Sequence, residues 1–307
     1  MSEAAVLPGQ PAETMEQPAS AVAPERRIHP ALATLRSLFR HRLFVTGLIL
    51  FGIIAILAVL APWITSANPN RLAMRFKFLP PGGDWVFGTD SFGRSMWART
   101  VYGAQLSMLI GASVVLINAV LGTLIGATAG YFRRTDNALM RVNDALMAFP
   151  AILLAIAVTA VLGPSTMNVI IALAIVYVPR TARIVRASVI VQREMDYVQA
   201  AVASGVGQLR ILWRHVLPNA MAPMIVQLSF LFAYAVLSEA TLSFLGVGAV
   251  PPTPTWGGMM AEGRDFMRDA PWIIAIPGVA LMITVLGLNM LGDGLRDVLD
   301  PRMGMHQ

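Results

Sequence analysis

From Leu43 to Ile64 the chain reads LFVTGLILFGIIAILAVLAPWI, a run of 22 residues without a charged side chain. A helix needs about 20 apolar residues to cross the hydrocarbon core of a bilayer, so this run predicts a membrane-spanning helix. Five arginines lie between residues 26 and 42, directly before it. A cleaved signal peptide has a short lead and an apolar core of about 7–15 residues. We therefore expect an uncleaved anchor, preceded by a disordered cytoplasmic tail over residues 1–25.

Composition extends this prediction to the whole chain. The 307 residues are 56% hydrophobic and only 13% charged, and their mean hydropathy is +0.65. Soluble domains carry about 25% charged residues. A surface this poor in charge cannot be solvated, so we expect most of the chain to lie in lipid.

The sequence lacks a P-loop lysine and any cysteine, and each of these absences excludes a class of enzyme. A phosphate-binding P-loop needs a lysine directly after a glycine, and Lys77, the one lysine among 23 basic residues, follows Phe76. The chain therefore cannot bind ATP through a P-loop of its own. It also has no cysteine, which excludes disulfides, thiolate zinc sites and iron–sulfur clusters. The four histidines are scattered and form no metal-binding pair: His29, His41, His215 and His306.

Further uncharged runs predict five more spans. Gly163-Pro164-Ser165 divides the run from Ala145 to Pro179, which is too long for one helix, into spans three and four. Arg180, Arg183 and Arg186 then follow at a spacing that keeps them near one helix face, from which they can snorkel to the interface if span four continues. The other spans are span two within Ala104–Phe132, span five within Ala222–Leu245 and span six over Trp272–Leu291.

Charge distribution orients these spans. With the N-terminus inside, 16 basic residues fall on the cytoplasmic side and 7 outside, as the positive-inside rule requires. We therefore predict an all-α membrane protein with six transmembrane helices and both termini cytoplasmic. Its parts are the tail 1–25, an N-terminal region 26–103, a core 104–292 with a cytoplasmic loop 180–221, and a C-tail 293–307. The external stretch Thr65–Gly103 is rich in turns, and we expect Arg94 and Arg99 to be surface charges on it.

The cytoplasmic loop holds the clearest functional pattern. It begins with a helix of small residues that includes Gln199, Ala200 and Ala201, and this helix ends at Gly205. A second amphipathic helix follows and ends at Leu217-Pro218. Alanines allow another protein surface to approach closely, so the loop is either an ordinary helix pair on the membrane surface or a rigid element that docks into a partner.

The loop resembles the EAA loop of ABC-importer permeases. That pattern is E-A-A, three residues, glycine, nine residues and I-x-L-P. Ala200-Ala201, Gly205 and Leu217-Pro218 match it at the right spacing, whereas Gln199 replaces the glutamate and His215 replaces the isoleucine. Gln199 can hydrogen-bond but carries no charge. The His-x-Leu-Pro-Asn variant is similar to the peptide/nickel branch of the family.

Other motifs resemble the dipeptide/oligopeptide "C"-type subunit of that branch, and the likeness covers about residues 30–302. They are Gly88–Arg94, Tyr102–Ser107, Glu239–Gly246, Pro251–Gly257 and Asn289–Arg302.

The resemblance implies a type I ABC-importer permease fold in a bacterial inner membrane. It implies a non-catalytic subunit that moves di- or oligopeptides, or nickel and related small solutes, into the cytoplasm by ATP-driven alternating access. The implied partners are a sister permease, two cytoplasmic P-loop ATPases that bind ATP-Mg, and an extracytoplasmic solute-binding protein. The chain itself would hold no cofactor. Residues Gln199, Ala200, Ala201, Gly205, His215, Leu217 and Pro218 would couple it to an ATPase.

Two features inside the spans remain. Glu239 is the one acid well within a span; an ionisable group at that depth is a candidate functional group, but we favour a structural role in which it pins the turn Gly246–Trp256. Gly122, Gly126 and Gly130 form a doubled small-xxx-small pattern of the kind that packs helices in lipid. Their neighbour is either another helix of this chain or the sister subunit.

Two alternatives stay open from the residues alone. An ion-coupled secondary transporter usually shows internal repeats and midplane charges, and this chain offers one acid and no evident repeat. An intramembrane enzyme needs a nucleophile with a base within reach, yet no histidine falls in a predicted span.

Overall fold

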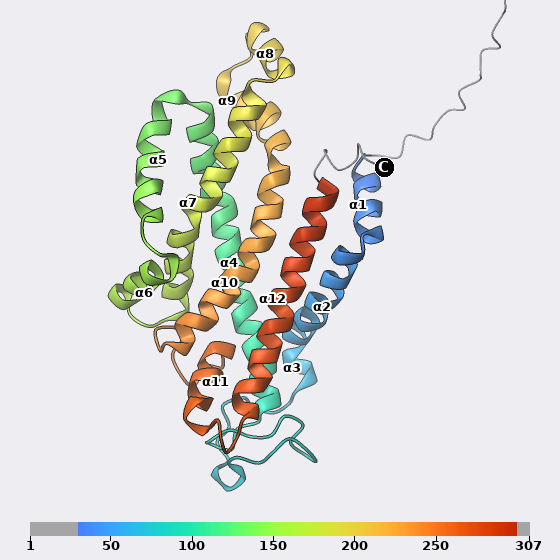
Figure 1. Cartoon of the computed structure of the whole chain (residues 1–307), viewed down its shortest axis with the longest axis vertical. Coiled ribbons are helices and arrows are strands. Elements are labelled where there is room, and N and C mark those ends of the chain that lie inside the picture. Colours follow the sequence, from blue (N-terminus) through green and yellow to red (C-terminus); the bar gives the residue numbers. More distant parts are fainter. Residues whose placement is uncertain (1–29, 300–307) are drawn as a thin grey trace, which may run out of the picture.

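The computed structural model describes residues 30–299. The predicted tail 1–25 and the last part of the C-tail lie outside the described residues. Within that range the chain is helical, with two isolated β-bridges and no strand (Figure 1). The elements are α1 Pro30–Arg40, α2 Arg42–Val59, α3 Ala61–Ile64, η1 Met74–Phe76, α4 Met96–Tyr131, α5 Arg133–Met147, α6 Ala151–Leu162, α7 Thr166–Arg193, α8 Asp196–Ala203, α9 Gln208–Ile211, η2 Leu212–Val216, η3 Pro218–Ala220, α10 Met221–Phe244, α11 Trp256–Gly263, η4 Arg264–Phe266 and α12 Trp272–Leu299.

The described residues contain five helical stretches that are long and apolar enough to cross a membrane. They are α2, α4, α7, the continuous stretch from α9 to α10, and α12. The helices α5 and α6 make a sixth span if the pair is counted as one, although the chain bends by 91° between them. The all-helical membrane fold expected from the sequence is confirmed.

The bundle has two different ends (Figure 1). At one end α8 and α9 project beyond the long helices, and we call this the α8 end. At the opposite end lie α3, α11 and the segment 65–95, and we call this the α11 end. The first described helix, α1, and the last turn of α12 both lie toward the α8 end.

Span three differs from the uncharged run that predicted it. The structure has no straight helix over Ala145–Leu162; α5 carries charged residues and ends at Met147, and α6 starts after Pro150. A proline disfavours helical backbone in the residue before it, which accounts for a break at this point. The charges of α5 are tolerated because α7 supplies partners: Arg186 Nε lies 2.5 Å from Asp136 Oδ1, and Arg183 Nη2 lies 2.7 Å from Asp144 Oδ1.

Helices α4 and α7 pack against each other along much of their length. Gly122, Gly126 and Gly130 all face α7. A Cβ atom on Gly122 would lie 2.7 Å from Thr181 Cβ, and one on Gly130 would lie 2.8 Å from the Arg186 carbonyl oxygen. At Gly126 a Cβ would collide with the Ala182 carbonyl group. The neighbour of the glycine stripe is therefore another helix of this chain, and no larger residue fits without separating the two.

The expectation that Arg94 and Arg99 are surface charges is wrong. Both are buried, with 5% and 1% of their side chains exposed. Arg94 Nε lies 2.5 Å from Asp90, and Arg99 Nη2 lies 3.1 Å from Glu262 of α11. Buried charges persist only when they are paired. Glu262 also pairs with Arg94, so it holds both the segment before α4 and α4 itself against α11. Helix α4 begins at Met96, eight residues before the predicted span Ala104–Phe132, after the N-cap Ser95, whose side chain accepts from the Ala98 N–H.

Candidate functional site

The loop between α7 and α10 forms the projecting α8 end. Its first helix, α8, ends in a left-handed turn at Gly205, whose φ is +75°. The Gly205 N–H donates to the Val202 carbonyl at 3.0 Å, and the Val206 N–H donates to the Ala201 carbonyl at 3.2 Å. These two bonds make a Schellman motif, in which glycine is favoured because it adopts a positive φ without strain. The predicted glycine break is thus the C-terminal cap of α8.

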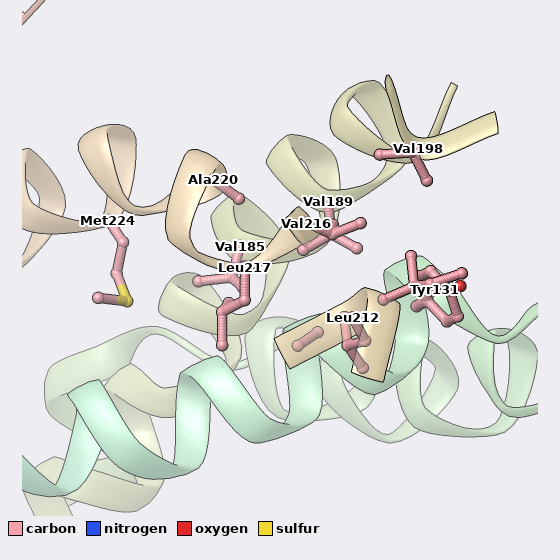
Figure 2. Close-up of a cluster of buried hydrophobic side chains, with 11 residues drawn as sticks. Tyr131, Val185, Val189, Val198, Leu212, Val216, Leu217, Ala220 and Met224 are labelled. Carbon is pink, nitrogen blue, oxygen red and sulfur yellow. The ribbon is translucent and has the colours of Figure 1, made fainter. Parts of the chain in front are cut away.

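The inner side of this loop is anchored by a buried apolar cluster (Figure 2). Val198 of α8 and Leu212 and Val216 of η2 pack with side chains from the ends of α4 and α7. Such burial removes apolar surface from water and fixes the loop to the long helices. The cluster therefore places α8 in direct packing contact with those helices. The cluster comprises Ala127, Tyr131, Val185, Val189, Val198, Ile211, Leu212, Val216, Leu217, Ala220 and Met224.

Polar contacts add to this anchoring. Gln199 Nε2 donates to the Arg193 carbonyl oxygen at 3.0 Å, which ties α8 to the last residue of α7. A glutamate at this position, as in the EAA pattern, could not donate to that carbonyl when ionised. The Tyr197 hydroxyl donates to the His215 carbonyl at 3.3 Å, and the Tyr131 hydroxyl donates to Gln208 Oε1 at 2.6 Å. The uncharged Gln199 therefore has a structural use in this chain.

The outer side of the loop is open and partly apolar. Ala200, Ala203 and Gly205 are exposed. Four large apolar side chains of the same loop are also exposed, and exposed apolar groups are a frequent feature of protein contact sites. Together with the exposed Ala200, Ala203 and Gly205, these side chains form what we call the α8 surface: Tyr197 (41% exposed), Val202 (41%), Leu209 (64%) and Trp213 (49%).

The seven residues predicted to couple the chain to an ATPase all lie in this loop, but in different environments. Leu217 is buried in the cluster and takes no part in the outer surface. Pro218 is exposed and opens η3, and the helical path continues into α10, so the predicted stop at Pro218 is wrong. Proline is tolerated at the first position of a helical turn because its missing N–H has no partner to lose there. Gln199, Ala200 and Gly205 are exposed, whereas Ala201 and His215 are half-buried.

Several residues that hold the loop in place escaped sequence reasoning. Tyr131 and Arg193 bridge elements that are far apart in the chain: Arg193 Nη1 donates to the carbonyl oxygens of Gly130 and Tyr131 at 3.2 and 3.1 Å. No local pattern marks such long-range contacts.

Glu239 lies at the other end of the bundle, near the start of α11. It is fully buried, and its carboxylate accepts hydrogen bonds from Ser107 of α4 at 2.9 Å and from Ser243 at 2.7 Å. Just beyond it, Trp256 Nε1 of α11 donates to the Thr100 carbonyl at 3.0 Å, which holds α11 to α4. Among the described residues no three histidine or acidic side chains gather to hold a metal ion.

Comparison with known protein families identifies the chain. Residues 119–305 match the model described as binding-protein-dependent transport system inner membrane component. The chain belongs to this permease family. Residues 32–81 also match the N-terminal transmembrane domain of oligopeptide transport permease C.

Relatives of this permease are similar over almost their whole length. It is 54% identical over 291 residues to a peptide transport system permease protein of Brucella abortus, covering 95% of this chain and 98% of the relative. It is 43% identical to the dipeptide transport system permease protein DppC of Alkalihalophilus pseudofirmus, with 90% and 91% covered. A D,D-dipeptide transport system permease protein of Escherichia coli is 38% identical, with 86% and 89% covered.

The permease also resembles a solved structure. An inward-facing MetNI methionine ABC transporter structure matches 66% of this chain and 97% of its own, with a TM-score of 0.56 and 19% identity. At that identity the match shows the fold, which is that of a type I ABC-importer permease. The family expected from the EAA-like loop and the other motifs is confirmed.

Proposed function

We propose that this permease forms half of the membrane pathway of an importer that moves di- and oligopeptides into the cytoplasm, driven by ATP. A sister permease would form the other half, and an extracytoplasmic solute-binding protein would deliver the peptide. Two cytoplasmic P-loop ATPases would bind ATP-Mg, and this chain would hold no cofactor and catalyse no reaction. The relatives named for peptide and dipeptide transport support this substrate class.

The mechanism is supported by the way in which the α8 end is built. Its exposed alanine helix is capped by Gly205 and backed by the buried cluster, so it offers a firm, closely approachable surface. In the proposed cycle an ATPase cleft receives this surface. Closure of the ATPase dimer on ATP moves α8, and the cluster transmits the movement to α4 and α7.

The same geometry supports an orientation. Both described chain ends lie at the α8 end (Figure 1), and an excess of basic residues marks the cytoplasmic side of a membrane protein. Arg36, Arg40 and Arg42 at the start of the helices, and Arg193, Arg210 and Arg214 in the loop, are all at the α8 end. We therefore place the α8 end and both termini in the cytoplasm, with the chain in the inner membrane.

Reconstitution tests this function. The complete complex in proteoliposomes should take up a labelled dipeptide when ATP and the loaded binding protein are present. Uptake should persist when a protonophore collapses the proton gradient and should stop when ATP is withheld. Uptake that follows the proton gradient and ignores ATP would overturn the proposal in favour of a secondary transporter.

A further inference from the structure

Arg180 lies in the middle of α7, and no acidic side chain within residues 30–299 pairs with it. The first 14 residues of this helix, Thr166 to Pro179, carry no charge. The next two arginines, Arg183 and Arg186, each pair with a carboxylate of α5. In the part of the chain that the structure describes, no ion pair forms with Arg180. A cation at this depth therefore needs another explanation.

The neighbours of Arg180 form a polar face shared by two helices. Its guanidinium lies over the ring of Tyr234 of α10, 5.5 Å from Cζ to the ring centroid. Tyr177, one turn earlier on α7, is joined to Ser238 of α10 by a hydrogen bond of 2.7 Å between the hydroxyl groups. Arg180 is exposed, and Tyr234 is 44% exposed. We call these four residues the Arg180 face.

Such a face is costly in contact with lipid. An ionisable side chain in a span is rare and usually faces the bundle interior or a water-filled cavity. A snorkelling arginine extends along its own helix toward the interface, whereas this guanidinium is held sideways over a ring of the neighbouring helix. A water-filled pathway beside α7 and α10 would provide the polar surroundings that this cation needs.

The chemical groups of the Arg180 face favour an anionic ligand. Arg180 Cζ lies 5.5 Å from the centroid of the Tyr234 ring, and within the described residues no acceptor forms an ion pair with its N–H donors. Their planar fork matches a carboxylate, which can accept two parallel hydrogen bonds. Tyr177 and Ser238 add hydroxyl groups beside it.

We propose that Arg180, which lies over the ring of Tyr234, binds the carboxylate of the transported solute as it crosses the membrane. This inference rests on the proposed function, because the peptides that it names carry a C-terminal carboxylate. A solute that crosses a low-dielectric region loses water around that charge, and a paired guanidinium offsets the loss.

The first test compares two ligands in two proteins. Uptake of dialanine and of its C-terminal amide is measured in the reconstituted complex at saturating loaded binding protein, for the wild type and for Arg180→Gln. The preference of the binding protein is the same in both proteins, so it cancels. We expect the ratio of dialanine uptake to amide uptake to fall at least about tenfold in Arg180→Gln, as for a lost charge-assisted hydrogen bond. The control Arg183→Gln, on the same helix, should keep the wild-type ratio.

An unchanged ratio in Arg180→Gln would overturn the inference while leaving peptide transport intact. An equal loss of both uptakes would also overturn it, because that result indicates an acidic partner in the sister permease. Absence of ATP-dependent uptake of either ligand by the wild type would instead overturn the proposed function.

The second test measures whether a water-soluble reagent reaches position 180 and whether dialanine protects it. It does not require the binding protein to deliver the amide. The chain has no cysteine, so Arg180→Cys introduces a single thiol. A charged, membrane-impermeant methanethiosulfonate should modify it, and dialanine with binding protein and ATP should slow the modification at least about fivefold. Arg183→Cys should react without protection. An unreactive Cys at position 180, or one that dialanine does not protect, would overturn the inference.

Discussion

Replacing Gly205 by alanine should loosen α8 by a calculable amount. The residue has a φ of +75°, and a Cβ placed on it would meet no heavy atom within 4 Å. The substitution therefore adds no collision, and its cost is that of a left-handed backbone for an L-residue, about 1–2 kcal/mol. Gly207 is the matched control: its φ is −63°, and a Cβ there also meets nothing within 4 Å. Gly207→Ala carries no left-handed backbone penalty; because Gly207 is the N-cap of α9, its cost should fall on α9 and not on α8.

Hydrogen exchange measured by mass spectrometry on the reconstituted complex reports this difference locally. If 1–2 kcal/mol is lost from the cap of α8, the amides of Asp196–Ala203 should exchange about 5–30 times faster in Gly205→Ala. They should exchange at the wild-type rate in Gly207→Ala. The number of peptides transported per ATP should fall in the first variant alone. Equal exchange and equal coupling in the two variants would refute the role of the Gly205 cap.

Three other substitutions address the remaining sites. Ala201→Glu forces a carboxylate against the apolar cluster behind α8; insertion into the membrane should be normal and uptake should fall at least about tenfold, whereas normal uptake in vesicles would contradict the role of the cluster in coupling. Gly126→Leu overpacks the contact with α7 and should lower the free energy of unfolding by about 1–3 kcal/mol, measured as a lower midpoint of thermal unfolding. Gly52→Leu has open space around it and should leave that midpoint unchanged. Glu239→Gln keeps hydrogen bonds to both serines and should be mild; complete loss of uptake with normal assembly would show that the charge is needed.

Hydropathy was sufficient to predict most spans, because the long helices bury their backbone polar groups internally and expose apolar side chains to lipid. It failed at span three. There the uncharged run predicted a straight helix from Ala145, whereas α5 begins at Arg133 and its Asp136 and Asp144 pair with Arg186 and Arg183 of α7. Pairing between distant helices cannot be deduced from one local stretch.

The same limit applies to Arg94 and Arg99. Asp90 is a partner near in the chain, but Glu262, which joins both arginines to α11, lies more than 160 residues away, and no local pattern indicates that contact. The α8 loop was easier to predict, since small residues, a glycine and a proline at fixed spacing are local features. Its anchoring through Tyr131 and the valines of α7 was not, because it arises only when α4 and α7 lie side by side.

The central claim is that the α8 surface contacts the ATPase. Because the chain lacks cysteine, Ala200→Cys places one exposed thiol on that surface, and Trp63→Cys places another on α3 at the α11 end, where Trp63 is 77% exposed. In the assembled importer, a bifunctional thiol-to-amine reagent should join the residue at position 200 to an ATPase subunit, and the residue at position 63 to none. Adducts between position 63 and the ATPase, with none at position 200, would contradict the account.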